Sequence, residues 1–250
     1  NGIDDDGNGF IDDIYGYDFV NNDGNPADDN GHGTHVAGIV AADGNNGFGV
    51  SGVSWNSKIM ALKFMGRDGT GSTSDAVRAI NYATMMKTQY GVDIQITNNS
   101  WGGQGYSTSL YNAIVANKEA GMLFIAAAGN ESQDNDATPY YPADYNVENI
   151  ITVAATDWTD QLASYSNYGA TSVDVAAPGT YIYSTVTTGA SGYMSGTSMA
   201  APMVSGLAAL AWSYDPDASW QQIKAAILDN GDTLASLDGK VATGKRINAY

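Results

Sequence analysis

Three clusters of small and polar residues each contain a side chain suited to nucleophilic catalysis. They are Asn30-Gly31-His32-Gly33-Thr34-His35-Val36-Ala37-Gly38, Ala126-Ala127-Ala128-Gly129-Asn130 and Ser195-Gly196-Thr197-Ser198-Met199-Ala200-Ala201-Pro202. Imidazole is the usual general base near neutral pH, and a serine hydroxyl that loses its proton can attack a carbonyl. An asparagine amide can donate a hydrogen bond to the oxyanion that results. The three clusters therefore contain the groups needed for acyl transfer.

Each cluster also has a plainer interpretation. A histidine is more often structural, an asparagine after glycine usually belongs to a turn, and a serine before a helix is normally a cap. The pair His32 and His35 also has a spacing seen in zinc sites. No third ligand of the zinc type lies near it, however, and a glycine-rich start is wrong for a zinc-protease helix.

Short apolar runs alternate with amphipathic stretches along the chain. We expect a helix over 74–90 that Ser74 caps and Gly91 ends. The other expected helices are 110–120, 197–212 and 218–228, and the expected strands are 59–64, 94–98, 123–126, 150–154 and 173–176. This alternation predicts an α/β fold, three-layer and doubly wound, whose mostly parallel sheet has helices on both faces. We expect one domain over residues 1–250.

The catalytic candidates fall where such a fold places its ligands. In doubly wound sheets, ligands bind at the carboxyl ends of the strands. Small-residue clusters follow the expected strands after Phe64, Ile96 and Ile125. Ser198 should lie in the first turn of a helix, where free N–H groups and the helix dipole favour a developing negative charge.

The bulk composition limits the partners and the chemistry. The net charge of −17 disfavours nucleic acid and anionic membranes, and no apolar run approaches the roughly 20 residues of a membrane span. The absence of cysteine excludes a disulfide framework and a thiol nucleophile. A secreted protein without disulfides needs another means of stabilisation, and a bound metal is the obvious candidate.

Nine aspartates and no lysine or arginine occupy the first 30 residues. One interpretation is a solvated acidic tail. The spacing of oxygen ligands around Gly9 instead favours a calcium loop that differs from an EF-hand, because Tyr15 stands where the final glutamate would be. The expected ligands are the side chains of Asp4, Asp6 and Asn8, the carbonyl of Phe10, and Asp12 or Asp13.

The three clusters, in this order, resemble the signature blocks of the subtilisin-like serine proteases. The resemblance continues through Ser100-Trp101-Gly102-Gly103, Tyr141-Pro142-Ala143, Ala177-Pro178-Gly179 and Gly244-Lys245-Arg246-Ile247-Asn248-Ala249. It implies a subtilisin-like fold and an extracellular, calcium-stabilised endopeptidase that acts on proteins or peptides. Nothing in the sequence indicates an oligomer, and we expect a monomer.

The resemblance also assigns roles to individual residues. His32 would be the general base, Ser198 the nucleophile, and Asn130 together with the Ser198 N–H the oxyanion donors, whereas His35 would be structural. An extended substrate would lie between Gly69-Thr70-Gly71 and Ser100-Trp101-Gly102, and a ladder of this kind predicts broad specificity. The primary pocket would be walled by Ala126, Ala127, Ala128 and Gly129, with Tyr140 on its floor.

A second calcium loop is suggested at Asn45-Asn46-Gly47-Phe48-Gly49-Val50, where Asn46 would supply a ligand. The alternative interpretation of this segment is a simple Asn-Gly turn.

The family's catalytic aspartate has no counterpart in this sequence. It belongs to an Asp-Thr-Gly or Asp-Ser-Gly block on a strand before the histidine, and no such block is present. We expect that strand upstream, either on a separate N-terminal fragment or missing from a truncated chain. The alternatives are that Asp18 or Asp29 replaces it, or that the domain is a non-catalytic, calcium-dependent binding or scaffold domain. A glycosidase with paired carboxylates is a third class, but it would leave the three clusters unexplained.

Overall fold

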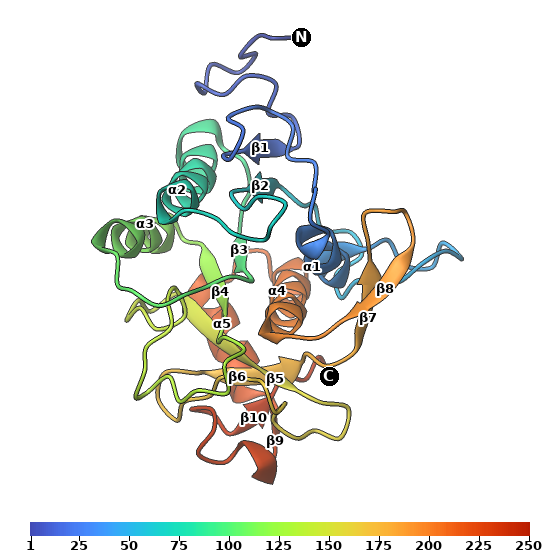
Figure 1. Cartoon of the computed structure of the whole chain (residues 1–250), viewed down its shortest axis with the longest axis vertical. Coiled ribbons are helices and arrows are strands. Elements are labelled where there is room, and N and C mark those ends of the chain that lie inside the picture. The colour runs from blue at the N-terminus through green and yellow to red at the C-terminus, as the bar shows by residue number, and fades with distance from the viewer.

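A six-stranded sheet forms the centre of the computed structural model, which describes residues 1–250 (Figure 1). Its strand order is β3-β4-β5-β6-β10-β9, and every neighbouring pair is parallel except β10 with β9. The bounds are β3 Ile96–Asn99, β4 Leu123–Ala127, β5 Ile150–Thr156, β6 Val175–Pro178, β9 Asp232–Thr233 and β10 Lys245–Arg246.

Helices cover both faces of this sheet, because its central strands are apolar on both sides. Along β4, Leu123, Ile125 and Ala127 pack in one core, whereas Phe124 and Ala126 pack in another, as the two-residue period of a strand requires. The first core includes α4 (Thr197–Tyr214) and α5 (Trp220–Asp229). The second includes α2 (Thr73–Tyr90) and α3 (Thr108–Glu119).

The remaining elements lie outside the six-stranded sheet. Strands β1 (Gly16–Asp18) and β2 (Ala61–Lys63) form a separate parallel pair, and β7 (Ile182–Thr185) and β8 (Ser191–Met194) form an antiparallel hairpin. Helix α1 (His32–Ala41) packs against α4 and β7. A short 3₁₀ helix spans Ala235–Leu237.

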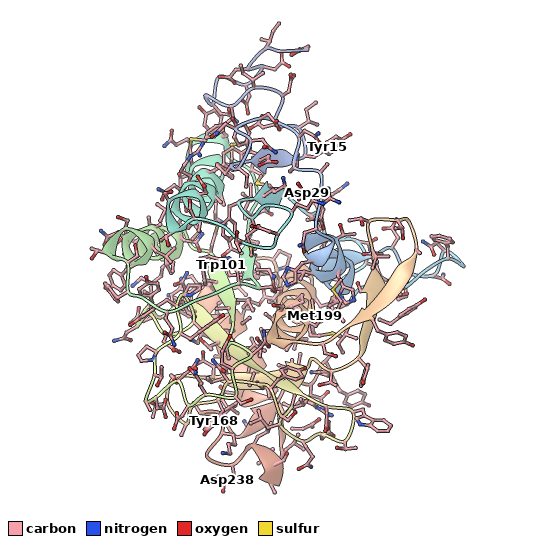
Figure 2. The ribbon with its side chains drawn as sticks, in the orientation of Figure 1. Tyr15, Asp29, Trp101, Tyr168, Met199 and Asp238 are labelled. Carbon is pink, nitrogen blue, oxygen red and sulfur yellow. The ribbon has the colours of Figure 1, made fainter.

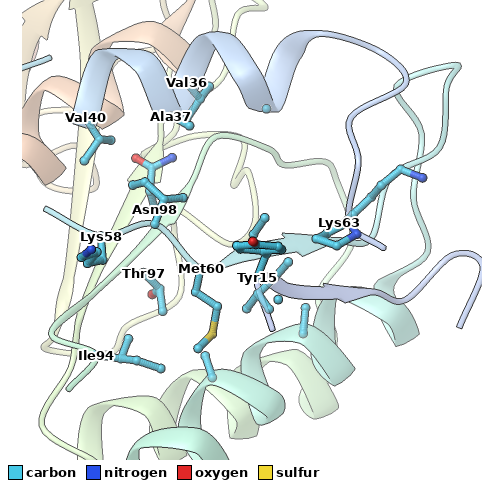
Figure 3. Close-up of a pocket in the computed structure, with 18 of the residues that line it drawn as sticks. Tyr15, Val36, Ala37, Val40, Lys58, Met60, Lys63, Ile94, Thr97 and Asn98 are labelled. Atoms are coloured by element: carbon cyan, nitrogen blue, oxygen red, sulfur yellow. The ribbon is translucent and has the colours of Figure 1, made fainter. Parts of the chain in front are cut away.

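A cavity of about 1910 Å³ separates β2 from β3. It is lined by residues of β2, of β3 and of α1, and by Ile94 just before β3. Val36 and Val40 of α1 and Ile94 are labelled in Figure 3. Strand β2 is paired only with β1, and β3 only with β4, so each strand has one edge without a backbone partner. The β1-β2 pair and the six-stranded sheet are therefore separate, with the cavity between them.

The predicted fold class is confirmed, and the expected helices and strands are present with small shifts of their ends. The predicted cap Ser74 is wrong. Helix α2 begins one residue earlier, and its cap is Ser72, whose side chain accepts a hydrogen bond from the Asp75 N–H. Gly91 ends the helix as expected, because it adopts the left-handed conformation. No helix is long and apolar enough to cross a membrane.

Candidate active site

Ser198 is the second residue of α4, as the sequence predicted. Its N–H therefore lies in the first turn, where no acceptor from the same helix is available. The Ser198 hydroxyl donates to the carbonyl of Ser100 at 3.2 Å, and the Ser100 hydroxyl donates to the carbonyl of Ser198 at 2.9 Å. This reciprocal pair fixes the start of α4 against the segment that follows β3.

Asn130 follows β4 and lies against the same helix end. Its side-chain oxygen accepts hydrogen bonds from the Thr197 N–H at 2.8 Å and from the Thr197 hydroxyl at 3.1 Å. Both contacts fix the acceptor end of the amide, and Nδ2 has no acceptor within the protein. A Cβ atom added at Gly196 would lie 3.6 Å from the Ser198 nitrogen and 3.7 Å from Asn130 Nδ2. The nearest atom to that position is the Asn130 side-chain oxygen at 3.5 Å, which Thr197 engages. Two N–H groups without an acceptor therefore lie near one point beside Gly196, a placement compatible with an oxyanion site.

His32 is the first residue of α1 and lines the same cavity as Ser198. The carboxylate of Asp28 fixes this helix start by accepting from the Gly31 N–H at 2.7 Å and the Thr34 N–H at 2.8 Å. Burial lowers the pKa of His32, and the negative charge of Asp28 opposes that shift. The imidazole is thus held in the neutral form that a general base needs.

No acid holds the imidazole of His32 by a hydrogen bond. Asp18 is buried and forms an ion pair with Lys63 at 2.7 Å, and Asp29 lies 3.4 Å from the same ammonium group. Both alternative acids are therefore engaged away from His32, and the structure does not support either as its partner. His35 is fully buried, and its Nε2 lies 3.1 Å from the carbonyls of Ile182 and Gly192, which is a structural contact.

Both predicted substrate segments contribute residues to the cavity lining. Gly69, Ser100 and Trp101 line the cavity that contains His32 and Ser198. The Trp101 ring packs edge-to-face on Phe64, with 5.0 Å between the ring centres. Thr70 donates to Asp68, and Gly71 pairs with Met65 through an antiparallel bridge. Gly71 approaches the Phe64 carbonyl so closely that an added Cβ would lie 2.5 Å from it.

The predicted pocket walls are buried. Ala127 is 3% exposed, Ala128 is fully buried, and Gly129 is buried beside them. Tyr140 packs its ring on Gly102, where an added Cβ would lie 2.3 Å from the ring. Burial raises the pKa of Tyr140 to about 12, with a contribution from the negative charge of Glu131. The Tyr140 ring is therefore placed between the segment after β3 and the segment after β4.

The predicted calcium ligands surround Asn8 in part. The Asn8 N–H donates to Asp4 at 3.0 Å, and its side-chain amide donates to Asp6 at 3.1 Å and to Asp13 at 2.7 Å. Asp12 instead pairs with the amino terminus at 2.7 Å. No three acidic or histidine side chains lie close enough together to hold a metal ion. The side chains of Asp4, Asp6 and Asp13 nevertheless offer carboxylate oxygens as metal ligands, and a hard cation such as calcium prefers oxygen ligands.

Asn46 lies in an exposed turn. Its side-chain oxygen accepts from the Phe48 N–H at 2.9 Å, and Asn45, Gly47 and Gly49 have left-handed backbones. This arrangement is the local Asn-Gly turn that the sequence offered as the alternative interpretation. The role of Asn46 as a metal ligand stays a prediction.

Comparisons with known proteins identify the family of this chain. The model of the subtilase family matches residues 2–244, and the chain belongs to that family. It is 44% identical over 237 residues to a thermophilic serine proteinase of Bacillus sp. (strain AK1), covering 95% of this chain and 55% of the relative. It is 40% identical to thermitase of Thermoactinomyces vulgaris, covering 95% of this chain and 80% of that protein.

A solved structure gives the same fold. The crystal structure of a cold adapted subtilisin-like serine proteinase matches with a TM-score of 0.83 and 33% identity, covering 94% of this chain and 80% of that one. The chain spans only about half the length of the Bacillus relative.

Sequence reasoning missed two residues that position the site. In the sequence, Asp28 is one of nine aspartates in the first 30 residues, and only its place shortly before the start of α1 distinguishes it. Thr197 was regarded only as a neighbour of Ser198, yet its N–H and hydroxyl orient the Asn130 amide. The position of Asp28 before a helix could have indicated its role. The role of Thr197 depends on the contact between the segment after β4 and the start of α4, which the sequence does not reveal.

Proposed function

We propose that residues 1–250 form most of the catalytic domain of a secreted serine endopeptidase that hydrolyses peptide bonds in proteins. The observation that carries this proposal is the convergence of the Ser198 N–H and the Asn130 amide at the start of α4, in the cleft that His32 lines. A serine in the first turn of a helix, with two free donors beside it, suits attack on a carbonyl and stabilisation of the resulting oxyanion.

In the proposed mechanism, the Ser198 hydroxyl attacks the carbonyl carbon of the substrate while His32 accepts its proton. The carbonyl oxygen becomes an oxyanion, which receives hydrogen bonds from Asn130 Nδ2 and the Ser198 N–H. His32 then gives the proton to the leaving amine, and an acyl-enzyme remains on Ser198. Water, activated by His32, hydrolyses this ester and restores the serine.

The acid that orients His32 would come from a strand inserted between β2 and β3. The free edges of these strands, the apolar lining of the cavity and the unpaired imidazole support this proposal. The Lys63 end of β2 and the Asn99 end of β3 both lie at the cavity that contains His32. An aspartate at the carboxyl end of a strand parallel to β3 would therefore reach the imidazole.

An extended peptide substrate would lie between residues 69–71 and 100–102, where its backbone forms hydrogen bonds and its side chains face the cleft. Tyr140 would then limit the primary pocket, because its ring packs on Gly102. The enzyme should prefer small or medium residues before the cleaved bond. Replacing Tyr140 by glycine should raise kcat/KM for a peptide with phenylalanine at that position about tenfold relative to alanine. Equal cleavage after both residues by the parent enzyme would contradict this role.

Calcium would be held by Asp4, Asp6, Asn8 and Asp13, with Phe10 supplying its carbonyl and Asn46 belonging to a second site. Bound calcium would neutralise the repulsion among the amino-terminal carboxylates and stabilise the loop that packs on α2. The short hydrogen bond from the Tyr82 hydroxyl to Asp13 supports this, because it already links the loop to that helix. We propose that the domain is monomeric and works outside the cell, where calcium is plentiful.

The function is tested by peptide hydrolysis in the presence of calcium, using the chain expressed with its natural upstream segment. We expect cleavage of casein and of a chromogenic peptide, and a loss of about 10⁶-fold in kcat in Ser198→Ala. The matched control is Ser195→Ala, which removes a nearby hydroxyl that contacts only the Tyr181 N–H. If neither the parent nor the control cleaves, the non-catalytic scaffold becomes the better account of this domain.

A further inference from the structure

The segment that carries Asn130 is held by a buried side chain, that of Asn167. The Asn167 side-chain oxygen accepts hydrogen bonds from the Glu131 N–H at 2.8 Å and from the Gln133 N–H at 3.1 Å. Its side-chain nitrogen donates to the Ala128 carbonyl at 3.1 Å, and its backbone N–H donates to the Gly129 carbonyl at 2.9 Å. These four bonds anchor the chain on both sides of Asn130.

Asn167 is fully buried, and both ends of its amide have partners. The packing around it is close, because a Cβ atom added at Gly129 would lie 2.3 Å from Asn167 Nδ2. Gly129 also has a left-handed backbone with φ near 113°, which disfavours any other residue. The turn that aims Asn130 is thus built from a glycine and from the asparagine that packs on it.

Asn135 provides an internal comparison. It is also buried, and its side-chain nitrogen donates to the same Ala128 carbonyl at 3.0 Å. Its side-chain oxygen has no partner, so it makes no contact with the N–H groups that follow Asn130. Both asparagines donate to the Ala128 carbonyl. Of the two, only Asn167 also accepts hydrogen bonds from the N–H groups of Glu131 and Gln133, which follow Asn130.

We propose that Asn167 is a positioning residue, which holds the backbone of residues 129–133 so that the Asn130 amide points to the oxyanion. The Thr197 N–H fixes the oxygen of that amide, and Asn167 fixes the backbone from which the amide extends. This inference rests on the proposed hydrolysis. Asn167 does not touch the reacting atoms, and it acts only through Asn130.

The test compares Asn167→Ala with Asn135→Ala in the chain expressed with its upstream segment. We expect Asn167→Ala to lower kcat about tenfold to fiftyfold with KM within twofold, and Asn135→Ala to change kcat less than threefold. A double-mutant cycle then separates positioning from general loosening. Asn130→Ala should lower kcat about 10²–10³-fold, and adding Asn167→Ala to it should lower kcat no further. The same additional loss in both backgrounds would overturn the proposal.

A conservative variant keeps the test decisive if Asn167→Ala does not fold. Asn167→Asp retains acceptors for the Glu131 and Gln133 N–H groups but loses the donor to the Ala128 carbonyl, so its kcat should lie between those of Asn167→Ala and the parent. A fall as large as that of Asn130→Ala would contradict the proposal.

A second readout does not depend on activity. Amide hydrogen exchange at Glu131 and Gln133 should be faster in Asn167→Ala than in the parent, and unchanged in Asn135→Ala. Faster exchange in a protein that cleaves nothing would leave the anchoring role intact and remove the proposed function. Unchanged exchange would remove the anchoring role, whatever the activity.

Discussion

The nucleophile side and the base side of this cleft differ in how completely they are built. On the nucleophile side, α4, β3 and β4 are joined by the reciprocal contacts of Ser100 with Ser198 and by the contacts of Asn130 with Thr197. On the base side, α1 is fixed by Asp28, but the His32 ring has no acid to orient it. The difference coincides with the pairing of the strands, because β3 to β6 form one continuous sheet, whereas β2 and β3 lie at the cavity without pairing with each other (Figures 1 and 3).

This difference indicates that the two halves of the site depend on different parts of the chain. Residues on the nucleophile side come from segments far apart in sequence, such as Ser100 and Asn130, which both contact the start of α4. Figure 2 shows Met199, the residue after Ser198, on that helix. Under the proposed function, the base side would receive one more strand in the cavity between β2 and β3. The oxyanion site should therefore form in this chain without help, whereas the orientation of His32 should depend on that strand.

The largest expected effect comes from obstructing the cavity. Ala37 lies on α1 and lines the cavity, so Ala37→Arg should block an inserted strand. We expect the upstream segment to raise the labelling rate of Ser198 by a fluorophosphonate about 10⁴-fold in the parent, and less than tenfold in this variant. The control is Asn56→Arg, an exposed position outside this cavity that adds the same charge. Equal stimulation of both variants would mean that the strand does not enter this cavity.

Removal of calcium should have the next largest effect, and it should act on the amino-terminal region first. Without the ion, the carboxylates of Asp4, Asp6 and Asp13 repel one another. We expect chelation to lower Tm by about 5–10 °C, with hydrogen exchange rising in residues 1–20 before it rises in β4. Asp13→Asn should lose most of the calcium response, whereas Asp5→Asn should keep it. A Tm that does not depend on calcium would contradict the metal site.

The smallest expected effect concerns the pH dependence of stability on the nucleophile side. Burial raises the pKa of Asp144 to about 7, although the Tyr140 N–H donates to it at 2.5 Å. The folded state therefore binds a proton that the unfolded state releases near pH 4, so this group lowers stability as pH rises from about 4 to 7.

Replacing Asp144 by asparagine should remove that slope. Because the carboxyl is only half-buried and solvent screens it, we expect a gain of about 1 kcal/mol at pH 8, or about 2–4 °C in Tm. The gain should vanish at pH 4. An equal Tm difference at both pH values would show that titration of Asp144 is not its cause.

The fold could be predicted from the sequence because its signals are local, whereas the roles of His32, Asn130 and Ser198 were inferred from the resemblance to the family and stay predictions. The apolar runs of β4 and β5 and the small residues before α4 indicate their structures without knowledge of the rest of the chain. The positions of Thr197 and Asn167 could not be predicted, because their roles depend on which loops meet after folding. The lack of pairing between β2 and β3 could not be predicted either, because it depends on tertiary structure. The upstream strand expected from the lack of an aspartate block before His32 stays a prediction.

We propose that the nucleophile side of the cleft is complete within residues 1–250, and that the base side lacks the strand whose aspartate would orient His32. The most direct test measures the rate of Ser198 labelling by a fluorophosphonate in this chain alone, and again after addition of the upstream segment. We predict slow labelling of the chain alone, abolished in Ser198→Ala, and a rise of about 10⁴-fold with the segment. Fast labelling of the chain alone, unchanged by the segment, would contradict the account, because some acid within residues 1–250 would then already orient His32.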